Sequence, residues 1–269
     1  MTLCVGPARR ARLGVASARI VASLLVTVLA SVVVSADVPD TIARVKPSVV
    51  GVGTFEPTRA PPFQFRGTGF AVGDGSIIVT NSHVLPVTLD AARNESIAIV
   101  VPGSGSSAAK VREVTRLAVD PGSDLALLKL PGQPLQPLKL KDSSAVREGQ
   151  EILITGYPIG AVLGMVPATH RGMVSAITPI AIPQAHANDL NEAVLRRLST
   201  GSFSVFQLDA TAYPGNSGSP IYDPATGEVL GVVNMVFVKG TKESALSQPS
   251  GITYAVPAQH LEALLKSAR

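Results

Sequence analysis

The chain has 269 residues, of which 46% are hydrophobic and 16% charged, enough for one large β domain or two small ones. Aromatic residues make up only 4%, while 24 glycines and 21 prolines favour short strands and many turns over helix bundles. The formal charge of +4 arises from Arg9, Arg10, Arg12 and Arg19, because without these four the 23 basic residues become 19, against 19 acidic residues. The chain after residue 36 thus has no net formal charge, which argues against nucleic acid as a partner.

Residues 1–36 have the composition of an export signal. A basic segment precedes an apolar run at 20–34, and the small residues Ser35 and Ala36 suit cleavage after Ala36. The alternative is a retained membrane anchor, but the run is short and diluted by hydroxyl residues. We therefore expect an exported protein, periplasmic or secreted, which associates with a membrane only if residues 1–36 are retained.

The cysteine and histidine counts limit the chemistry. Cys4 is the only cysteine and lies ahead of the apolar run, so the chain after residue 36 has no thiol for disulfides, metal sites or catalysis. The four histidines are widely scattered and no HExxH motif occurs, so we expect neither a metal nor another cofactor. His170 could line a cleft, although a structural role is favoured, and His186 and His260 are expected on the surface.

The first half of the chain reads as a series of short strands. Residues 40–46 have the spacing of one short helix, which Pro47 ends. Asp74-Gly75 is a hairpin signal between two runs of β-branched residues. Strands are expected at 48–55, 76–80, 97–101, 110–120 (one long strand) and 125–130.

A polar, proline-containing stretch at 131–149 is expected to link this half to a second one. Strands are expected there within 151–156, 170–178, 204–210, 228–238 and 251–257, followed by a closing helix over 257–267. Between them, the alternation typical of strands is lost from residue 181 to residue 200, and NDLNEAVLRRL has helical spacing. We interpret 181–203 as an insertion that gates or tunes a site.

The stretch TAYPGNSGSP, residues 211–220, contains the best candidate nucleophile, Ser217. A serine hydroxyl needs a base to take its proton and donors to hold the oxyanion that forms. A tight turn through Gly215, Asn216 and Ser217 can point backbone N–H groups into one small space, and glycine permits the close approach of an acyl group. An ordinary hairpin turn is the alternative, because the same residue types make such turns.

Two further polar residues lie at strand ends and complete a chemical set. His83 follows the strand at 76–80, and Asp124 stands immediately before the apolar LALL run. A lone histidine is more often structural, and an aspartate there is equally a surface turn residue or a buried one. Together with Ser217, however, they are what acyl transfer needs: the imidazole accepts the hydroxyl proton and the carboxylate fixes the imidazole tautomer.

The motifs TNSHV, SDLALLKL, TGYPIG, RGMVSAI, QLDATAYPGNSGSP, GEVLGVVN and GITYAVP resemble the successive motifs of HtrA/Deg-type trypsin-like serine proteases. The resemblance covers the chain from about residue 41 to its end. It implies an all-β fold of two packed six-stranded antiparallel β-barrels, at about 47–140 and 148–256, within a protease domain at 37–269. A short N-terminal helix and a C-terminal helix at 257–267 complete the expected fold, with a cleft between the barrels.

The resemblance also implies the roles of particular residues. His83 is expected as general base, Asp124 as orienting acid and Ser217 as nucleophile of a serine endopeptidase acting on unfolded or exposed polypeptides. The turn Gly215-Asn216-Ser217 is expected to form the oxyanion hole, chiefly through the Gly215 and Ser217 amides. Thr211 corresponds to the base of the substrate pocket. The expected walls, Val233, Asn234 and Met235, predict cleavage after small or aliphatic residues rather than basic ones.

The sequence departs from the family pattern in two ways. HtrA proteins usually carry PDZ domains, and none is visible here, so activation through a PDZ domain is not expected. Ser219 stands where many relatives have glycine, as in glutamyl endopeptidases, but GVVNMVF lacks the histidine those enzymes place after the nucleophile. The resemblance implies a homotrimer. Two alternatives stay open: a catalytically silent trypsin-fold binding protein, and a membrane-anchored regulatory protease.

Overall fold

The computed structural model describes eight segments of the chain: residues 1–2, 37–103, 108–158, 160, 165–179, 203–211, 213–234 and 252–268. The β strands that the structure describes belong to one unit, Ala36–Arg269. Nearly all of the predicted export signal and of the 181–203 insertion lies outside the described residues, as do Met235 and His186. Among the helices that are described, none has the length and apolar character needed to cross a membrane.

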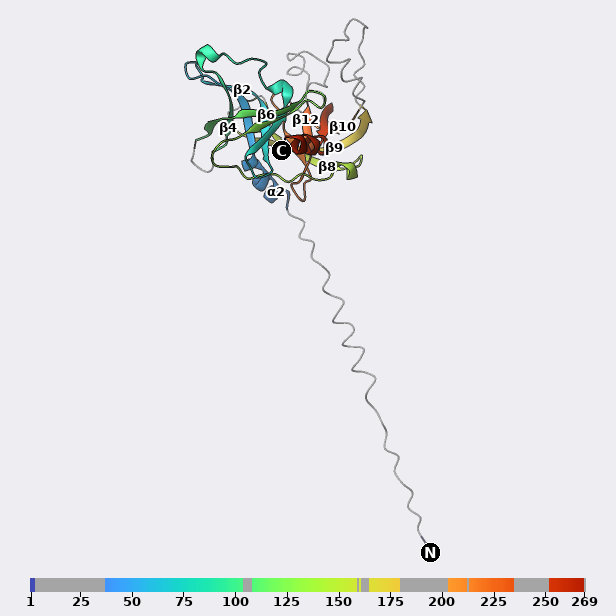
Figure 1. Cartoon of the computed structure of the whole chain (residues 1–269). Helices are drawn as coiled ribbons and strands as arrows, with labels where there is room; N and C mark the ends of the chain where they lie inside the picture. The colour runs from blue at the N-terminus through green and yellow to red at the C-terminus, as the bar shows by residue number, and fades with distance from the viewer. Residues whose placement is uncertain are drawn as a thin grey trace. The chain divides into compact units, whose positions relative to one another are not determined.

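The fold begins with helix α2 and a 3₁₀ turn that lead into the first sheet (Figure 1). Pro39 occupies the first turn of α2, where its missing N–H costs nothing, and Thr41 and Val45 are its buried residues. The elements of this half are α2 (Val38–Val45), η1 (Lys46–Ser48), β1 (Val49–Phe55), β2 (Phe63–Val72), β3 (Ile77–Asn81), η2 (Ser82–Val84), η3 (Ala91–Arg93), β4 (Ser96–Val101), β5 (Lys110–Glu113), β6 (Thr115–Asp120) and β7 (Leu125–Lys129).

The predicted long strand at 110–120 is divided at Val114 into β5 and β6. The sheet order is β5-β4-β1-β2-β3-β7-β6, so these two strands stand at opposite edges although one residue joins them. Val114 is buried and its N–H donates to the carbonyl of Ile97 at 2.9 Å. A bend at this residue therefore lets one stretch of chain pair on both edges and curls the sheet round on itself.

The second half forms a closed barrel with the strand order β10-β13-β12-β11-β8-β9. A bulge at Ser175, which is left without a partner between the pairs Gln207–Ala176 and Leu208–Val174, bends β9 where it pairs with β10. The elements are η4 (Ser143–Ala145), β8 (Glu151–Gly156), β9 (Ala168–Pro179), β10 (Ser204–Asp209), β11 (Pro220–Tyr222), β12 (Val229–Asn234), β13 (Ile252–Pro257) and α5 (Ala258–Ser267). A curled sheet beside a closed antiparallel barrel confirms the predicted trypsin-like double-barrel architecture.

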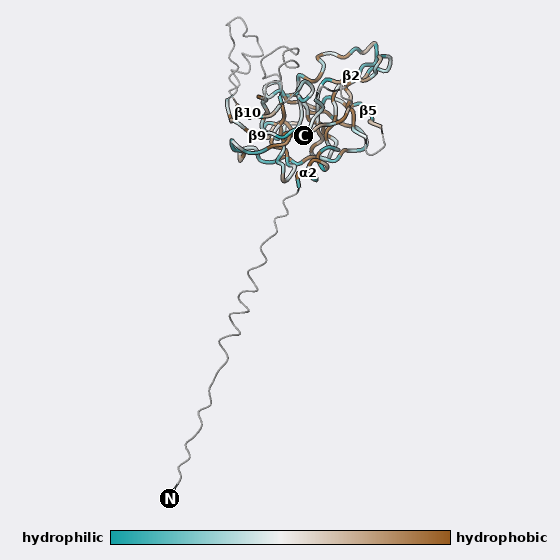
Figure 2. Tube along the Cα trace, turned by 180° about the vertical axis from the view of Figure 1, so that it is seen from behind, coloured by the Kyte–Doolittle hydropathy of each residue, from teal (hydrophilic) through white to brown (hydrophobic). Residues whose placement is uncertain are grey.

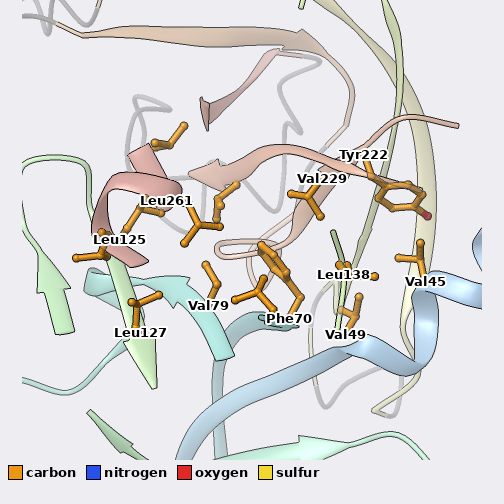
Figure 3. Packing of buried hydrophobic residues seen from close by; sticks show 14 of the residues in the cluster. Val45, Val49, Phe70, Val79, Leu125, Leu127, Leu138, Tyr222, Val229 and Leu261 are labelled. Carbon is orange, nitrogen blue, oxygen red and sulfur yellow. The ribbon is translucent and has the colours of Figure 1, made fainter. Parts of the chain in front are cut away.

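Apolar side chains from both halves meet between the barrels. Phe70 and Val79 of the first half and Tyr222 and Val229 of the second belong to one buried cluster, together with Leu261 of α5 (Figure 3). Helix α5 also contacts β6 and β7 of the first half and β12 and β13 of the second. In Figure 2 the hydrophobic stretches gather toward the middle of the described fold. This shared core fixes the junction at which the candidate site lies.

Candidate active site

The turns that carry His83 and Asp124 are joined by hydrogen bonds to the Asp124 carbonyl oxygen. His83 lies in η2, directly after β3, and Asp124 lies between β6 and β7. Asp124 has a φ of 55°, a left-handed conformation that is uncommon outside glycine. Its carbonyl oxygen accepts from Ser82 N–H and from Asn81 Nδ2, each at 3.0 Å. These contacts hold the two candidate residues side by side within the first barrel.

A line of hydrogen bonds runs from Asp124 through His83 to Ser217. The Nδ1 atom of His83 lies 2.6 Å from Asp124 Oδ2, and its Nε2 atom lies 3.0 Å from Ser217 Oγ. A carboxylate can only accept, so Nδ1 carries the proton and Nε2 is left to accept from the Ser217 hydroxyl. Asp124 is 3% exposed, whereas the His83 side chain is 31% exposed. The line thus runs from a buried acid to an imidazole that solvent and ligands can reach.

The Asp124 carboxylate is fully surrounded by donors. Oδ1 accepts from Ser82 Oγ and from His83 N–H, and Oδ2 accepts from His83 Nδ1 and, at 2.8 Å, from Asn234 Nδ2. Burial raises the pKa of Asp124, but the hydrogen bond and charge of His83 and the Ser82 hydroxyl outweigh it, so the pKa lies below its ordinary value. Asp124 is therefore a carboxylate at neutral pH.

Positive φ angles shape the turn around Ser217. Gly215 has a φ of 104° and Gly218 a φ of 86°. A Cβ atom would lie 2.4 Å from the Tyr157 carbonyl oxygen at Gly215 and 2.0 Å from the Thr68 carbonyl oxygen at Gly218, so both positions require glycine. Within the described residues, no carbonyl accepts from the N–H of Gly215 or Ser217, whereas Asn216 N–H donates to Tyr213 O at 3.0 Å.

The residues predicted to form a substrate pocket lie in three different environments. Thr211 is half-buried in the loop after β10. Val233 is fully buried in the core of the second barrel, and Asn234 is fully buried with its amide on Asp124. Asn234 therefore donates a hydrogen bond to the Asp124 carboxylate, a role that the sequence analysis did not predict. Met235 lies outside the described residues.

Two of the remaining histidines are partly buried. Burial lowers the pKa of His170, whose ring lies 6.3 Å from that of Tyr213. His260 was expected on the surface, but this prediction is wrong, because its ring packs on Phe203 with centroids 4.4 Å apart. Burial lowers the pKa of His260, against an opposing effect of the Asp120 charge. No His, Cys, Asp or Glu side chains in the described segments cluster in threes around a position for a metal ion.

The sequence analysis did not identify Thr68 or Ser82, and it gave Asn234 a different role, as a wall of the substrate pocket. Ser82 adjoins His83, and its place in TNSHV was a usable signal. No role was predicted for Thr68, which lies between Gly67 and Gly69, and Asn234 lies at a strand end whose side-chain direction the sequence leaves open. Each contacts a residue between 42 and 147 positions away. Contacts of this range become visible only in the folded chain.

A hydrogen-bonded aspartate, histidine and serine between two antiparallel β-barrels is the arrangement of trypsin-like serine peptidases. Residues 67–232 match the family model of the trypsin-like peptidase domain. The chain belongs to this family.

The relatives confirm the HtrA/Deg resemblance seen in the motifs. A probable periplasmic serine endoprotease DegP-like from Pseudomonas fluorescens is 29% identical over 195 residues, covering 72% of this chain and 33% of the relative. The mitochondrial serine protease HTRA2 of Bos taurus is 29% identical over 235 residues, covering 85% of this chain and 42% of the relative. The chain thus spans a third to two fifths of the length of these relatives.

Two solved structures share the fold. The Rv3671c protease from M. tuberculosis in its active form has a TM-score of 0.59 at 22% identity, covering 84% of this chain and 82% of that one. The HtrA-type protease AlgW with a tripeptide has a TM-score of 0.58 at 22% identity, covering 86% of this chain and 63% of that one.

Proposed function

We propose that this protein is an exported serine endopeptidase that hydrolyses peptide bonds through an acyl-enzyme. The observation that carries the proposal is the continuous line from Asp124 Oδ2 through His83 to Ser217 Oγ, at 2.6 and 3.0 Å. It joins a buried carboxylate of the first barrel to a hydroxyl of the second. The similarity to probable periplasmic serine endoproteases of the DegP-like type supports both the peptidase activity and the export.

In the first step, Ser217 Oγ forms a bond to the carbonyl carbon of the substrate. Its proton passes to His83 Nε2, which lies 3.0 Å away and has a free lone pair while Nδ1 is protonated. The carbonyl π electrons move to oxygen, and the oxyanion accepts from Gly215 N–H and Ser217 N–H. Asp124 stabilises the imidazolium without taking its proton. Asn216 separates the two donors and does not itself bind the oxyanion, because its N–H donates to the Tyr213 carbonyl oxygen.

The second half of the cycle returns the enzyme to its starting state. The C–N bond breaks as His83 Nε2 gives its proton to the leaving amine, and an ester to Ser217 stays behind. A water molecule then attacks the ester while His83 takes one of its protons. When the C–O bond to Ser217 breaks, that proton returns to the serine oxygen and the carboxylic acid leaves. No cofactor takes part in this sequence of proton transfers.

We further propose cleavage after small or aliphatic residues of unfolded or exposed polypeptides. Thr211 places no charge at the base of the proposed pocket, so nothing there would pair with a basic side chain. The N-termini of fragments from denatured casein, determined by mass spectrometry, test this preference, and a predominance of cleavage after Lys or Arg would refute it. The homotrimer and membrane association through residues 1–36 stay predictions.

Turnover of dye-labelled denatured casein tests the proposed activity. Ser217→Ala and His83→Ala should each lower kcat by about 10⁴- to 10⁶-fold, because residues that act as one unit cannot replace each other. Ser144→Ala serves as control, because this exposed serine of η4 donates its hydrogen bonds to the Asp142 side chain, which precedes η4. If the wild-type protein cleaves no faster than Ser217→Ala, the alternative of a catalytically silent binding protein is the correct one.

A further inference from the structure

Thr68 belongs to the first barrel, yet its polar atoms serve the nucleophile turn of the second. It lies in β2 and is fully buried. We propose that Thr68 is a positioning residue that holds the two oxyanion-binding amides in their productive arrangement. This inference rests on the proposed peptidase function and adds a residue outside the Asp124–His83–Ser217 line.

The Thr68 side chain fixes the peptide that joins Gly215 to Asn216. Its Oγ1 donates to the Gly215 carbonyl oxygen at 2.7 Å, while the N–H at the other end of the same peptide donates to Tyr213 O at 3.0 Å. This peptide lies directly between the two proposed oxyanion donors. Its orientation therefore determines how their N–H groups converge.

The Thr68 backbone fixes the next relevant peptide, from Ser217 to Gly218. Thr68 N–H donates to the Ser217 carbonyl oxygen at 2.8 Å, and Gly218 N–H donates to Val233 O at 3.0 Å. Each donor residue is thus followed by a peptide that is hydrogen-bonded at both ends. Thr68 provides one of the two bonds in both cases.

The direction of the Thr68 hydroxyl is itself determined by its neighbours. Tyr157 N–H donates to Oγ1 at 3.1 Å, so the single hydroxyl hydrogen is directed to Gly215 O. Thr68 in turn is held by Thr80, whose hydroxyl donates to the Thr68 carbonyl at 2.7 Å. Substitution by valine keeps the shape but leaves Gly215 O and Tyr157 N–H without this partner in a buried place.

The hydrogen bonds that Thr68 makes to Gly215 and Ser217, which we call the Thr68 clamp, matter because glycine offers little resistance to rotation of the peptides beside it. Gly215 lacks the Cβ that would restrict its backbone, so hydrogen bonds must hold its conformation. Loss of one oxyanion donor in serine proteases costs about 10²- to 10³-fold in kcat. Loss of the Thr68 hydroxyl, which disturbs the donors without removing them, should cost about 10- to 100-fold.

Saturation kinetics with an alkyl fluorophosphonate test the proposal, because its phosphoryl oxygen needs the same donors as a substrate oxyanion. The maximal labelling rate, kinact, should fall about 10- to 100-fold in Thr68→Val, with KI changed less than about threefold. Thr68→Ser, which keeps the hydroxyl, should stay within about threefold of wild type. Thr68→Cys should lie between them, because a thiol is a weak donor.

Thr54→Val is the matched control for a lost buried hydroxyl. Thr54 lies in β1, is 1% exposed and accepts from Arg59 Nη2 at 3.1 Å, away from the nucleophile turn. Its kinact should equal that of wild type even if its melting temperature falls. The inference is overturned if folded Thr68→Val is labelled at the wild-type kinact, or if Thr54→Val slows labelling as much.

The same experiment distinguishes a folding failure of Thr68→Val from a failure of the proposed peptidase function. If Thr68→Val does not fold, the serine and cysteine variants decide, and equal kinact values for these two contradict the clamp. If wild-type protein is not labelled at all while a control serine hydrolase in the same sample is, the proposed peptidase function fails, and the role of Thr68 fails with it.

Discussion

At the scale of single residues, Asp124 shows how the fold maintains a charge in its interior. The carboxylate is almost fully buried, which alone would favour its neutral form. The hydrogen bonds and charge of His83 and the Ser82 hydroxyl outweigh this effect on the pKa of Asp124, and Asn234 supplies a fourth donor to its two oxygens. The site therefore depends on a carboxylate that is stable only while its donors are in place.

The lowered pKa of Asp124 predicts how stability varies with pH. A carboxyl group with a depressed folded-state pKa contributes stability above its unfolded pKa, and the contribution disappears as pH falls through the folded value. The difference in unfolding free energy between wild type and Asp124→Asn should thus be constant above about pH 5 and shrink below about pH 4. Urea denaturation at several pH values measures it; a difference that grows on acidification contradicts the account.

Asn234 should matter for turnover without being part of the proton relay. Asn234→Ala removes the amide that donates to Asp124 Oδ2 at 2.8 Å, so the carboxylate and the His83 ring are held less firmly. We expect kcat to fall about tenfold, by analogy with other groups that orient a catalytic residue. The exposed Gln136→Ala is the control for casein turnover, and an unchanged kcat in Asn234→Ala would show that the amide is dispensable.

The residues of the hydrogen-bonded line could be found from sequence because their types and chain order are themselves a signal. His83 follows β3, Asp124 precedes β7 and Ser217 lies in the turn before β11, each beside turn-forming residues. The direction of a buried side chain such as Asn234 depends on strand twist and neighbours, and no sequence pattern encodes it. This is why it was first assigned to a pocket wall.

At the scale of elements, the end of β8 and the segment after Ser217 fit together through small residues. A Cβ atom on Gly156 would lie 2.0 Å from Ser219 Oγ and 2.9 Å from Asn216 Oδ1. Both of these side chains are fully buried. Ser219, the departure from the usual family glycine, therefore occupies the space that the absence of a side chain at Gly156 provides.

This complementarity predicts coupled effects on stability. Gly156→Ala should destabilise the protein by about 1–3 kcal/mol, because the buried neighbours have little room to move. Adding Ser219→Gly should recover at least half of the loss, whereas Ser219→Gly alone changes little. Urea denaturation of the four proteins gives the coupling energy, and strict additivity of the two changes would contradict the predicted contact.

The sequence predicted most of the strands, but it did not predict where a long strand is divided in two. The alternating run at 110–120 gave no sign that Val114 bends and changes the strand's pairing partner. Likewise, β11 is only Pro220–Tyr222, too short for a periodic pattern, and was not predicted. Both features follow from closing a sheet into a barrel, which is a property of the whole sheet.

At the scale of the molecule, the link between the two halves is bonded to both. Leu138 N–H donates to Ala71 O at 2.8 Å in the first half, and Lys141 N–H donates to Val229 O at 2.9 Å in the second. Lys141 Nζ also pairs with Asp223 at 2.7 Å. The linker thus helps to fix the relative position of the barrels, on which the distance between His83 and Ser217 depends.

The Lys141–Asp223 pair should contribute modest, pH-dependent stability. Burial raises the pKa of Asp223, but Lys141 and the amides of Ala225 and Thr226 lower it more, so the pKa lies below its ordinary value. The contribution is therefore present at neutral pH and lost in acid. Lys141→Met should cost about 0.5–1 kcal/mol at pH 7 and less near pH 3, measured by urea denaturation, with exposed Lys110→Met as control. An equal cost at both pH values would argue against the ion pair.

Sequence could define the two halves, their order and the candidate residues that each supplies. It could not define the contacts across the junction, such as those of Thr68 or α5, because these depend on how two curved sheets pack. The predicted insertion at 181–203 and the pocket residue Met235 lie outside the described residues, so their roles stay predictions.

The most direct test of the account is peptide mapping after fluorophosphonate treatment. We expect wild-type protein to carry one phosphonyl adduct, located on Ser217, and expect His83→Ala to acquire it far more slowly. Absence of an adduct on Ser217, in a sample where an added control serine hydrolase is fully labelled, would contradict the claim that the two barrels assemble a working nucleophile.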